Sequence, residues 1–427
     1  MEFTHEVIDG SPPCGRLGIC QPTDLTGNGR PDLIVGGMGA ETLPIVGTSG
    51  LPLVGRLLRR LETSVFWYEN PGWERHAIST TPNLYVFGNA LGDVTGNGRV
   101  DLLVGQGVGR REIYWFEQPD DPREPWTRFL VGSEFDKYHD LAFGDVDNDG
   151  EPELVGTSQE SEVVFYYDVP DDPREPWPDD CLHVIAENTN VEGLEIVDID
   201  GDGRNELIAG TSIYRQTGND SDGPRAGDGR EGSPGKGRAD GGSQSAREQS
   251  TDGEQQTARS PQARDGESGP VAAGWRREPI VTDWDWTRVA VGDLDGDGEP
   301  EVVFTEGDSP HLGSQMGRVG WFDPPDWEPH VLRYDMYCPH SVQLADFDGN
   351  GHLDIYVAEM GLGTNDEDAT HVIFRNQGGG EFEETIIERG IPTHEAKAVD
   401  VNGTGRIDIV GKSYSPNTHV DVWYNQE

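Results

Sequence analysis

The sequence predicts an all-β protein, a seven-bladed β-propeller with four-stranded blades in which an N-terminal strand closes the last blade. Three observations lead to this prediction. A nine-residue acidic motif occurs seven times, each copy lies among four short segments typical of β-strands, and the last set lacks one strand that the N-terminus can supply. We therefore expect residues 1–427 to form a single propeller domain.

The acidic motif sets the repeat. Most copies begin about 53 residues after the previous one, with extra length after the first and the fourth copies. A period in this range is typical of propellers and solenoids. The copies read DLTGNGRPD, DVTGNGRVD, DVDNDGEPE, DIDGDGRNE, DLDGDGEPE, DFDGNGHLD and DVNGTGRID, and they begin at Asp24, Asp93, Asp145, Asp198, Asp293, Asp346 and Asp400.

Four segments in each period have the composition of strands. An apolar segment precedes the motif and another follows it, as in DLAFG and ELVG around the third copy. An aromatic segment such as VFWYEN comes next, and then a segment such as WERHAI. Four short strands bounded by Gly, Pro, Asp and Asn make one propeller blade.

The ends of the chain predict how the ring closes. Residues 393–427 supply three strands of the seventh unit and end after VDVWYN. The segment FTHEVI, residues 3–8, matches the missing fourth strand. A ring closed in this way has no open sheet edge, which would otherwise invite aggregation.

The acidic motif offers the ligands of a calcium site. Oxygens at positions 1, 3, 5 and 9 can surround one hard cation, and glycine at position 6 allows the sharp turn. Where Thr26, Thr95 or Thr404 replaces a central ligand, a plain turn without an ion is an equal alternative. We predict Ca²⁺ in the other four copies, at Asp145, Asp147, Asp149, Glu153, Asp198, Asp200, Asp202, Glu206, Asp293, Asp295, Asp297, Glu301, Asp346, Asp348, Asn350 and Asp354.

The seven acidic loops, each followed by a strand, resemble FG-GAP or VCBS repeats, the calcium-loop propeller units also seen in integrin α subunits. The resemblance covers nearly the whole chain apart from two insertions. It implies a seven-bladed propeller with calcium in the loops of one face. It implies no single activity, because this family includes adhesion receptors, lectin-like modules and some carbohydrate lyases and dehydratases.

The charge of the chain limits its partners. With 79 acidic and 32 basic residues the formal charge is −47, so nucleic acid and anionic membranes would be repelled. Such a surface suits molar salt, where the Debye length is roughly 3 Å, and we expect a halophilic source. No stretch is long enough to span a bilayer, and the opening MEFTHEVIDG lacks the apolar core of a signal peptide. We expect a cytoplasmic location; the family resemblance implies an extracellular one as the alternative.

Two insertions interrupt the repeats. Residues 38–64 include LPLVGRLLRRLET, whose apolar residues recur at helical spacing, and we expect a short amphipathic helix there. Residues 217–270 are acidic and rich in Gly and Ser and contain no large apolar residue, so we expect disorder, between the third and fourth strands of the fourth unit.

The face opposite the acidic loops is the candidate binding surface, because it gathers the starts of the innermost strands and the turns between second and third strands. Of the four lysines in the chain, Lys137, Lys397 and Lys412 lie close to this rim. Salt bridges lining a polar channel are the structural alternative to a ligand site. Adjacent units five to seven place there the five candidate ligand-binding residues, Glu306, His340, Glu359, His394 and Lys412.

Two main hypotheses follow. In the first, the protein is a ligand-binding module that recognises a small polar or carbohydrate ligand through these five residues and the aromatic side chains of Tyr138, Tyr337 and Tyr414.

In the second hypothesis, the protein is a metal-assisted carbohydrate lyase or dehydratase. His340, His394 and Glu359 would hold a second divalent metal at the inner rim, and Lys412 or His139 would act as the general base. A third hypothesis leaves the rim inert and gives the acidic surface a protein partner.

Overall fold

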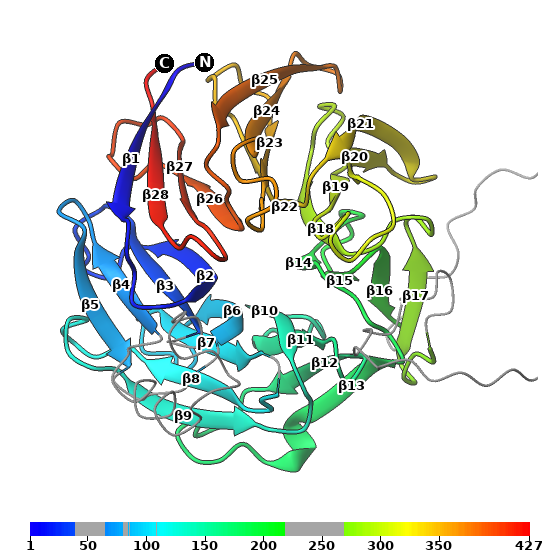
Figure 1. Ribbon diagram of the computed structural model, residues 1–427. Helices are drawn as coiled ribbons and strands as arrows, with labels where there is room; N and C mark the ends of the chain where they lie inside the picture. Colours follow the sequence, from blue (N-terminus) through cyan, green and yellow to red (C-terminus); the bar gives the residue numbers. More distant parts are fainter. Residues whose placement is uncertain (39–64, 80–83, 85, 108, 218–268) are drawn as a thin grey trace, which may run out of the picture.

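The chain forms a ring of seven antiparallel sheets, each with four strands, around a central axis (Figure 1). The computed structural model describes all residues except 39–64, 80–83, 85, 108 and 218–268. Both termini lie in the same blade, where the N-terminal strand is the outermost of four. The predicted fold class and the predicted ring closure are confirmed.

Each blade runs from an innermost to an outermost strand. In blades 1 to 3 the strands are β2 (Arg16–Thr23), β3 (Asp32–Met38), β4 (Val65–Glu69) and β5 (Glu74–Ser79); β6 (Val86–Gly92), β7 (Asp101–Gln106), β8 (Ile113–Glu117) and β9 (Thr127–Gly132); and β10 (Tyr138–Gly144), β11 (Glu153–Ser158), β12 (Val163–Asp168) and β13 (Leu182–Glu187).

The remaining blades follow the same order. In blades 4 to 7 the strands are β14 (Leu194–Val197), β15 (Glu206–Ala209), β16 (Ser212–Gln216) and β17 (Trp275–Pro279); β18 (Thr287–Gly292), β19 (Glu301–Glu306), β20 (Gly317–Asp323) and β21 (Glu328–Met336); β22 (Pro339–Ala345), β23 (Asp354–Glu359), β24 (Thr370–Asn376) and β25 (Phe382–Arg389); and β26 (Glu395–Val399), β27 (Asp408–Lys412), β28 (Val420–Asn425) and β1 (Phe3–Asp9).

Small differences from the predicted elements concern blade 4. Its fourth strand, Trp275–Pro279, begins three residues before the expected segment EPIV. Residues 217–270 fall between β16 and β17, as expected, but apart from their ends they lie outside the described residues. The helix predicted within residues 38–64 also lies outside them. The one helix in the described part of the chain is the short 3₁₀ turn η2 (Asp179–Cys181).

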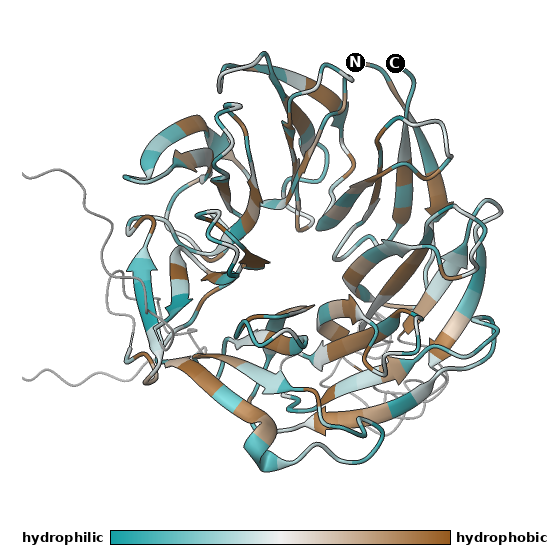
Figure 2. Cartoon of the chain, turned by 180° about the vertical axis from the view of Figure 1, so that it is seen from behind, coloured by the Kyte–Doolittle hydropathy of each residue, from teal (hydrophilic) through white to brown (hydrophobic). Residues whose placement is uncertain are grey.

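The hydrophobic core lies between the blades rather than on the axis. Among the described residues, buried apolar side chains form seven clusters, one at each junction of neighbouring blades. Between blades 1 and 2, for example, Ile19 and Ile34 pack with Leu102 and Val104. In Figure 2 the hydrophobic residues lie on the strands, and the connecting loops are mostly hydrophilic. Because the core lies between the blades, the axis is left free for polar side chains.

Side-chain amides tie neighbouring blades together at the level of the acidic loops. In four blades, a buried Asn or Gln near the end of the third strand donates a hydrogen bond to the second residue of the acidic loop in the preceding blade. The pairs are Asn70 with the Val401 carbonyl, Gln118 with that of Leu25, Asn376 with that of Leu294 and Asn425 with that of Phe347. The Asn70 bond joins blade 1 to blade 7 and so closes the ring.

Candidate functional site

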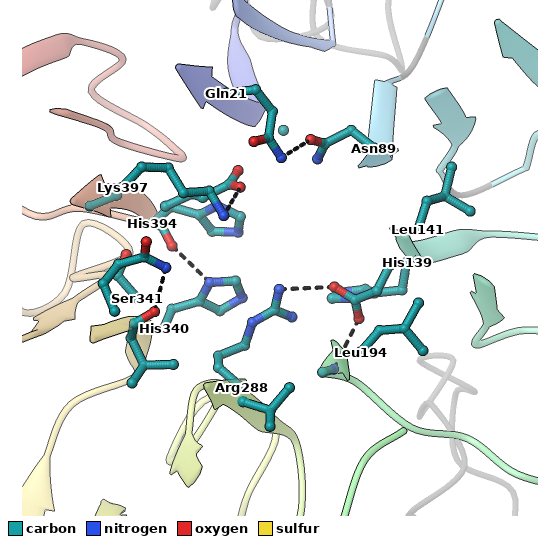
Figure 3. Close-up of a pocket in the computed structure, with 18 of the residues that line it drawn as sticks. Gln21, Asn89, His139, Leu141, Leu194, Arg288, His340, Ser341, His394 and Lys397 are labelled. Carbon is teal, nitrogen blue, oxygen red and sulfur yellow. Dashed lines mark hydrogen bonds and ion pairs between the residues drawn. The ribbon is translucent and has the colours of Figure 1, made fainter. Parts of the chain in front are cut away.

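A cavity of about 150 Å³ lies on the axis and is lined by the innermost strands of all seven blades. Figure 3 shows that its side chains converge from around the ring: Gln21 from β2, Asn89 from β6, His139 from β10, Arg288 from β18 and His340 from β22. The lining is mainly polar, with apolar side chains between the polar ones. Every repeat therefore contributes to this one site.

Irregular pairing at the start of the innermost strands places key residues of the cavity. Register shifts interrupt the pairing of β2, β6, β10 and β22 with their neighbours. In β10 the shift contains His139 and Asp140, and in β22 it contains His340. Bulges of this kind re-aim side chains and are common next to functional sites. Here they let consecutive residues reach the cavity.

Asp140 is the most heavily bonded carboxylate of the cavity. Its Oδ1 accepts a hydrogen bond from Arg288 Nη2 at 2.9 Å, and its Oδ2 accepts one from the Gly193 backbone N–H at 3.1 Å and contacts His139 Nδ1 at 2.9 Å. Burial alone would raise the pKa of Asp140, but Arg288 and His139 outweigh burial and hold that pKa well below its ordinary value. Asp140 is therefore ionised at neutral pH.

Three stacked rings stand at one side of the site, and two of them, His340 and His394, line the cavity. The His340 and His394 rings are 4.0 Å apart, and the Tyr414 ring follows 4.7 Å from His394. Lys412 contacts His394 Nδ1 and donates a hydrogen bond to the Leu17 carbonyl at 2.8 Å. Burial lowers the pKa of His340 to about 3 and that of Lys412 to about 8, and it also lowers the pKa of His394. Both imidazoles are therefore neutral at pH 7.

The structure brings together only some of the residues proposed from the sequence. His139, His340 and His394 line the cavity. Lys412 is fully buried behind His394 and is not among the lining residues. The other two candidates, Glu306 and Glu359, are not among the residues that line the cavity.

The carboxylates of Glu306 and Glu359 interact with residues outside the cavity lining. The Glu306 carboxylate pairs with Arg318 at 2.8 Å, and Glu359 Oε2 accepts a hydrogen bond from the Thr370 backbone N–H at 2.7 Å. Both glutamates end second strands, one strand further from the axis than the lining residues.

Asp140 and Arg288 are the residues that sequence reasoning missed. Both lie five residues before the first aspartate of their acidic loops, one position after the one that holds the predicted residues His139, His340 and His394. The same position holds Ser341 and Glu395 in blades 6 and 7, and both of these line the cavity. Comparing that position across the repeats would have identified polar side chains in four of the seven blades, 3, 5, 6 and 7.

The acidic loops share one backbone design. In five of the seven loops the first aspartate accepts hydrogen bonds from at least two backbone N–H groups of its loop; in blade 4, Asp198 accepts from Asp202 at 3.0 Å and from Gly203 at 2.9 Å. In blades 3 and 5, Asp145 and Asp293 each accept one such bond. Gly203 has a φ of 89°, a left-handed conformation that favours glycine. The glycine predicted at position 6 therefore allows the backbone conformation of the turn, as expected from the motif.

The residue at position 9 separates the loops into two kinds. In blades 1, 2, 6 and 7 it is aspartate, and both its oxygens accept backbone N–H bonds; Asp354, for example, accepts from Phe347 at 3.0 Å and from Asn376 at 2.8 Å. In blades 3, 4 and 5 it is glutamate, and one oxygen accepts the equivalent bond within the loop. The longer glutamate side chain leaves its second oxygen available to the loop.

The glutamate loops have the clustered oxygens that a cation requires. Carboxylate oxygens lie within 4.8 Å of one another in each of these clusters, and two buried oxygens, Asp145 Oδ1 and Glu301 Oε1, have no hydrogen-bond partner. Burial raises the pKa of Glu153 to about 8. The clusters are Asp145 with Asp147 and Glu153; Asp198 with Asp200 and Glu206; Asp293 with Asp295 and Asp297; and Asp295 with Glu301 and Asp323.

Arginine side chains neutralise two of the four loops for which calcium was predicted. In blade 4, Arg215 Nη1 lies 2.8 Å from both Asp200 and Glu206. In blade 6, Arg375 Nη2 lies 2.8 Å from Asp348. The unpartnered carboxylate oxygens of the acidic loops belong to blades 3 and 5, whereas in blades 1 and 2 the buried oxygens without a partner are the hydroxyls of Thr26 and Thr95. Among the four loops for which calcium was predicted, those of blades 3 and 5 therefore fit a bound cation best.

Comparison with known proteins agrees with this architecture. The FG-GAP-like repeat family matches residues 93–156 and 346–411. No curated protein sequence matches the chain. Virginiamycin B lyase from Staphylococcus aureus has a similar structure, with a TM-score of 0.51 and 10% identity over 99% of this chain and 99% of that chain. The V. cholerae biofilm matrix protein Bap1 gives a TM-score of 0.49 and 10% identity, over 100% of this chain and 92% of that chain.

The similarity to virginiamycin B lyase concerns the fold alone, because sequence identity of 10% carries no residue roles from one protein to another. Among the described residues, no helix has both the length and the apolar character needed to cross a membrane. The family match and the ring of seven four-stranded sheets together identify the chain as a seven-bladed β-propeller with FG-GAP-like repeats.

Proposed function

We propose that this protein is a ligand-binding propeller that holds a small polar ligand, most favourably a carbohydrate, in its axial cavity. One observation carries the proposal: two lining residues, Arg288 and Ser341, have buried polar atoms, Nη1 and Oγ, without a hydrogen-bond partner. A buried polar group left unpaired costs about 1–3 kcal/mol. A ligand with hydroxyl or carboxylate oxygens would satisfy both atoms and recover this free energy.

The composition of the lining supports a carbohydrate. Amides of Gln21 and Asn89 and carboxylates of Glu195 and Glu395 provide the donors and acceptors that sugar hydroxyls need. Leu141 supplies apolar surface, as in most small-molecule sites. The cavity is smaller than the roughly 300–1,000 Å³ of pockets for drug-sized ligands, so it suits a single sugar unit or the end of a longer glycan.

Calorimetric titration with a panel of neutral sugars, uronic acids and sugar phosphates tests this proposal. We expect at least one class to bind the wild type and to bind Ser341→Val at least tenfold more weakly. Arg276→Gln, an exposed substitution on β17, is the matched control and should bind as the wild type does. Failure of the whole panel to bind, or equal binding by Ser341→Val, would overturn the proposal.

We also propose Ca²⁺ in the acidic loops of blades 3 and 5. The support is the pair of unpartnered buried oxygens, Asp145 Oδ1 and Glu301 Oε1, together with the clustered carboxylates around them. Calcium prefers six to eight oxygen ligands and accepts irregular geometry, which suits a loop of carboxylates and backbone carbonyls. A bound ion would fix the corners of these blades on the face opposite the axial site.

The second candidate function is a carbohydrate lyase or dehydratase. It is favoured by the near-neutral pKa of Lys412, about 8, and by burial of His139, which lowers the pKa of that imidazole and keeps it able to accept a proton. Because Lys412 reaches the cavity only through His394, His139 is the better base. Incubation with uronic-acid glycans, followed by ultraviolet detection of an unsaturated product, tests it. Binding without product would favour the binding module.

A further inference from the structure

A second cluster of ligating side chains lies beside the axial cavity, away from the acidic loops. Glu192, Asp308 and His340 are 1%, 8% and 5% exposed, and a carboxylate oxygen or ring nitrogen from each lies within 4.8 Å of the others. They belong to three consecutive blades: Glu192 precedes β14, Asp308 follows β19 and His340 lies in β22.

His340 is held in the form that binds a metal. Its Nδ1 donates a hydrogen bond to the His394 carbonyl oxygen at 2.8 Å, so Nε2 keeps its lone pair. Metal-bound histidines usually donate their other ring N–H to a carbonyl or carboxylate, which fixes the tautomer and the orientation of the ring. His340 also lines the axial cavity (Figure 3).

Glu192 has an oxygen that the protein leaves without a donor. Gln159 Nε2 donates to Oε1, and His139 Nε2 lies 3.3 Å from the same oxygen. The second oxygen, Oε2, is buried and has no hydrogen-bond partner; Arg288 Nη1 lies 3.9 Å from it. A carboxylate oxygen with this degree of burial normally has a partner, so this one indicates a group that the protein alone does not supply.

The local charge matches a divalent cation. The carboxylates of Asp140, Glu192 and Asp308 lie around one guanidinium, that of Arg288, whose Nη2 is 2.9 Å from Asp140 and whose Nη1 is 3.9 Å from Glu192. Buried carboxylates are costly unless they are paired or coordinate a metal, and a divalent cation held by Glu192 and Asp308 would meet this requirement.

We propose that Glu192, Asp308 and His340 bind one divalent transition metal, such as zinc or manganese, beside the axial cavity. Imidazole together with carboxylates suits these ions better than calcium, which prefers oxygen ligands alone. Three protein ligands leave coordination positions for water or for a ligand in the cavity, on the side where His340 lines it. The site does not depend on a carbohydrate ligand.

This ligand set differs from the set predicted from the sequence, which was His340, His394 and Glu359. The Glu359 carboxylate accepts hydrogen bonds from Thr370, and His394 Nδ1 contacts Lys412. Only His340 is common to both sets.

Calorimetric titration of the full chain with Zn²⁺ and with Mn²⁺, in excess Ca²⁺ to saturate the acidic loops, tests the proposal. We expect one equivalent of transition metal to bind the wild type and its affinity to fall at least tenfold in Asp308→Asn and His340→Gln. The matched controls His183→Gln and Asp283→Asn, on the outer part of the ring, should bind as the wild type does, and so should Glu359→Gln. Wild type that binds no metal under these conditions, or cluster variants that bind normally, would overturn the proposal.

A spectroscopic measurement keeps the proposal testable if the variants do not fold. X-ray absorption of the zinc-loaded wild type should give one nitrogen among oxygen ligands, with a Zn–N distance of about 2.0–2.1 Å. A shell of oxygens alone would overturn the assignment. Sugar titrations of metal-free protein separate this result from the proposed carbohydrate binding, since either can fail while the other holds.

Discussion

Asp140 in blade 3 and Arg288 in blade 5 form an ion pair that passes the inner end of blade 4, with 2.9 Å between Oδ1 and Nη2. In blade 4, β14 is only four residues long and is preceded by Gly193, whose backbone N–H also donates to Asp140. A Cβ atom at position 193 would lie 2.8 Å from the Thr287 carbonyl oxygen, closer than such contacts occur. Blades that are not neighbours are thus connected across the axis.

Removing Arg288 should destabilise the protein. Arg288→Met leaves Asp140 and Glu192 largely buried without their counter-ion, and breaking such a pair costs about 3 kcal/mol. Chemical denaturation measures the change in the free energy of unfolding. The exposed Arg276→Met is the control, and we expect a change within about 0.5 kcal/mol. Adding Asp140→Asn should recover part of the loss, because it removes one of the unpaired charges.

Chelation should lower the melting temperature, and single loop variants should identify the responsible blades. Asp147→Asn in blade 3 and Asp295→Asn in blade 5 should each remove one equivalent of bound Ca²⁺. Asp348→Asn in blade 6 should leave the count unchanged, because Arg375 already neutralises that loop. Calcium titrations in molar salt, where the formal charge of −47 is screened, give the counts. Equal effects in all three variants would contradict the distinction between these loops.

Lys412 should make stability depend on pH in the alkaline range. Its pKa is lowered from 10.5 to about 8 in the folded protein, so between these values the unfolded chain holds a proton that the folded chain has released. Stability should therefore rise as the pH increases from 8 to 10.5, by roughly 3 kcal/mol from this group. Lys412→Met should remove that part of the slope in denaturation measured across the window. An identical slope in both proteins would show that the lysine is not desolvated.

The amide of Asn70 should matter for ring closure. It is 3% exposed and donates to the Pro31 and Val401 carbonyl oxygens at 2.9 and 2.6 Å, so Asn70→Leu leaves two buried acceptors without their donor. We expect a loss of about 1–3 kcal/mol in thermal or chemical unfolding. Gln377→Leu is the matched control, since the Gln377 amide donates in an exposed position. If Asn70→Leu lost no more unfolding free energy than the control, the amide would not contribute to ring closure, and apolar packing would account for it.

The sequence by itself determined the ring. Each repeat carries its own turn chemistry, with an aspartate that accepts backbone N–H bonds and a glycine in the left-handed conformation, so the strands around Asp198 and Gly203 can be located without their neighbours. The missing last strand and the matching N-terminal segment were equally local signals. Signals of this kind lie within short segments and repeat along the chain, so they can be recognised from the sequence alone.

The tertiary structure alone decided which side chains share the axis. The repeat spacing predicted Glu306 and Glu359 as site residues, but they lie in second strands, one strand away from the axis. It did not predict Asp140 and Arg288, which lie in the innermost strands of blades 3 and 5, Asp140 within the register shift of β10. Nothing in the sequence indicated that Arg215 and Arg375 bind carboxylates of two acidic loops. Contacts between blades depend on how closely strands from different repeats approach each other. Neither the spacing nor the composition of a single repeat determines the distance between two such strands.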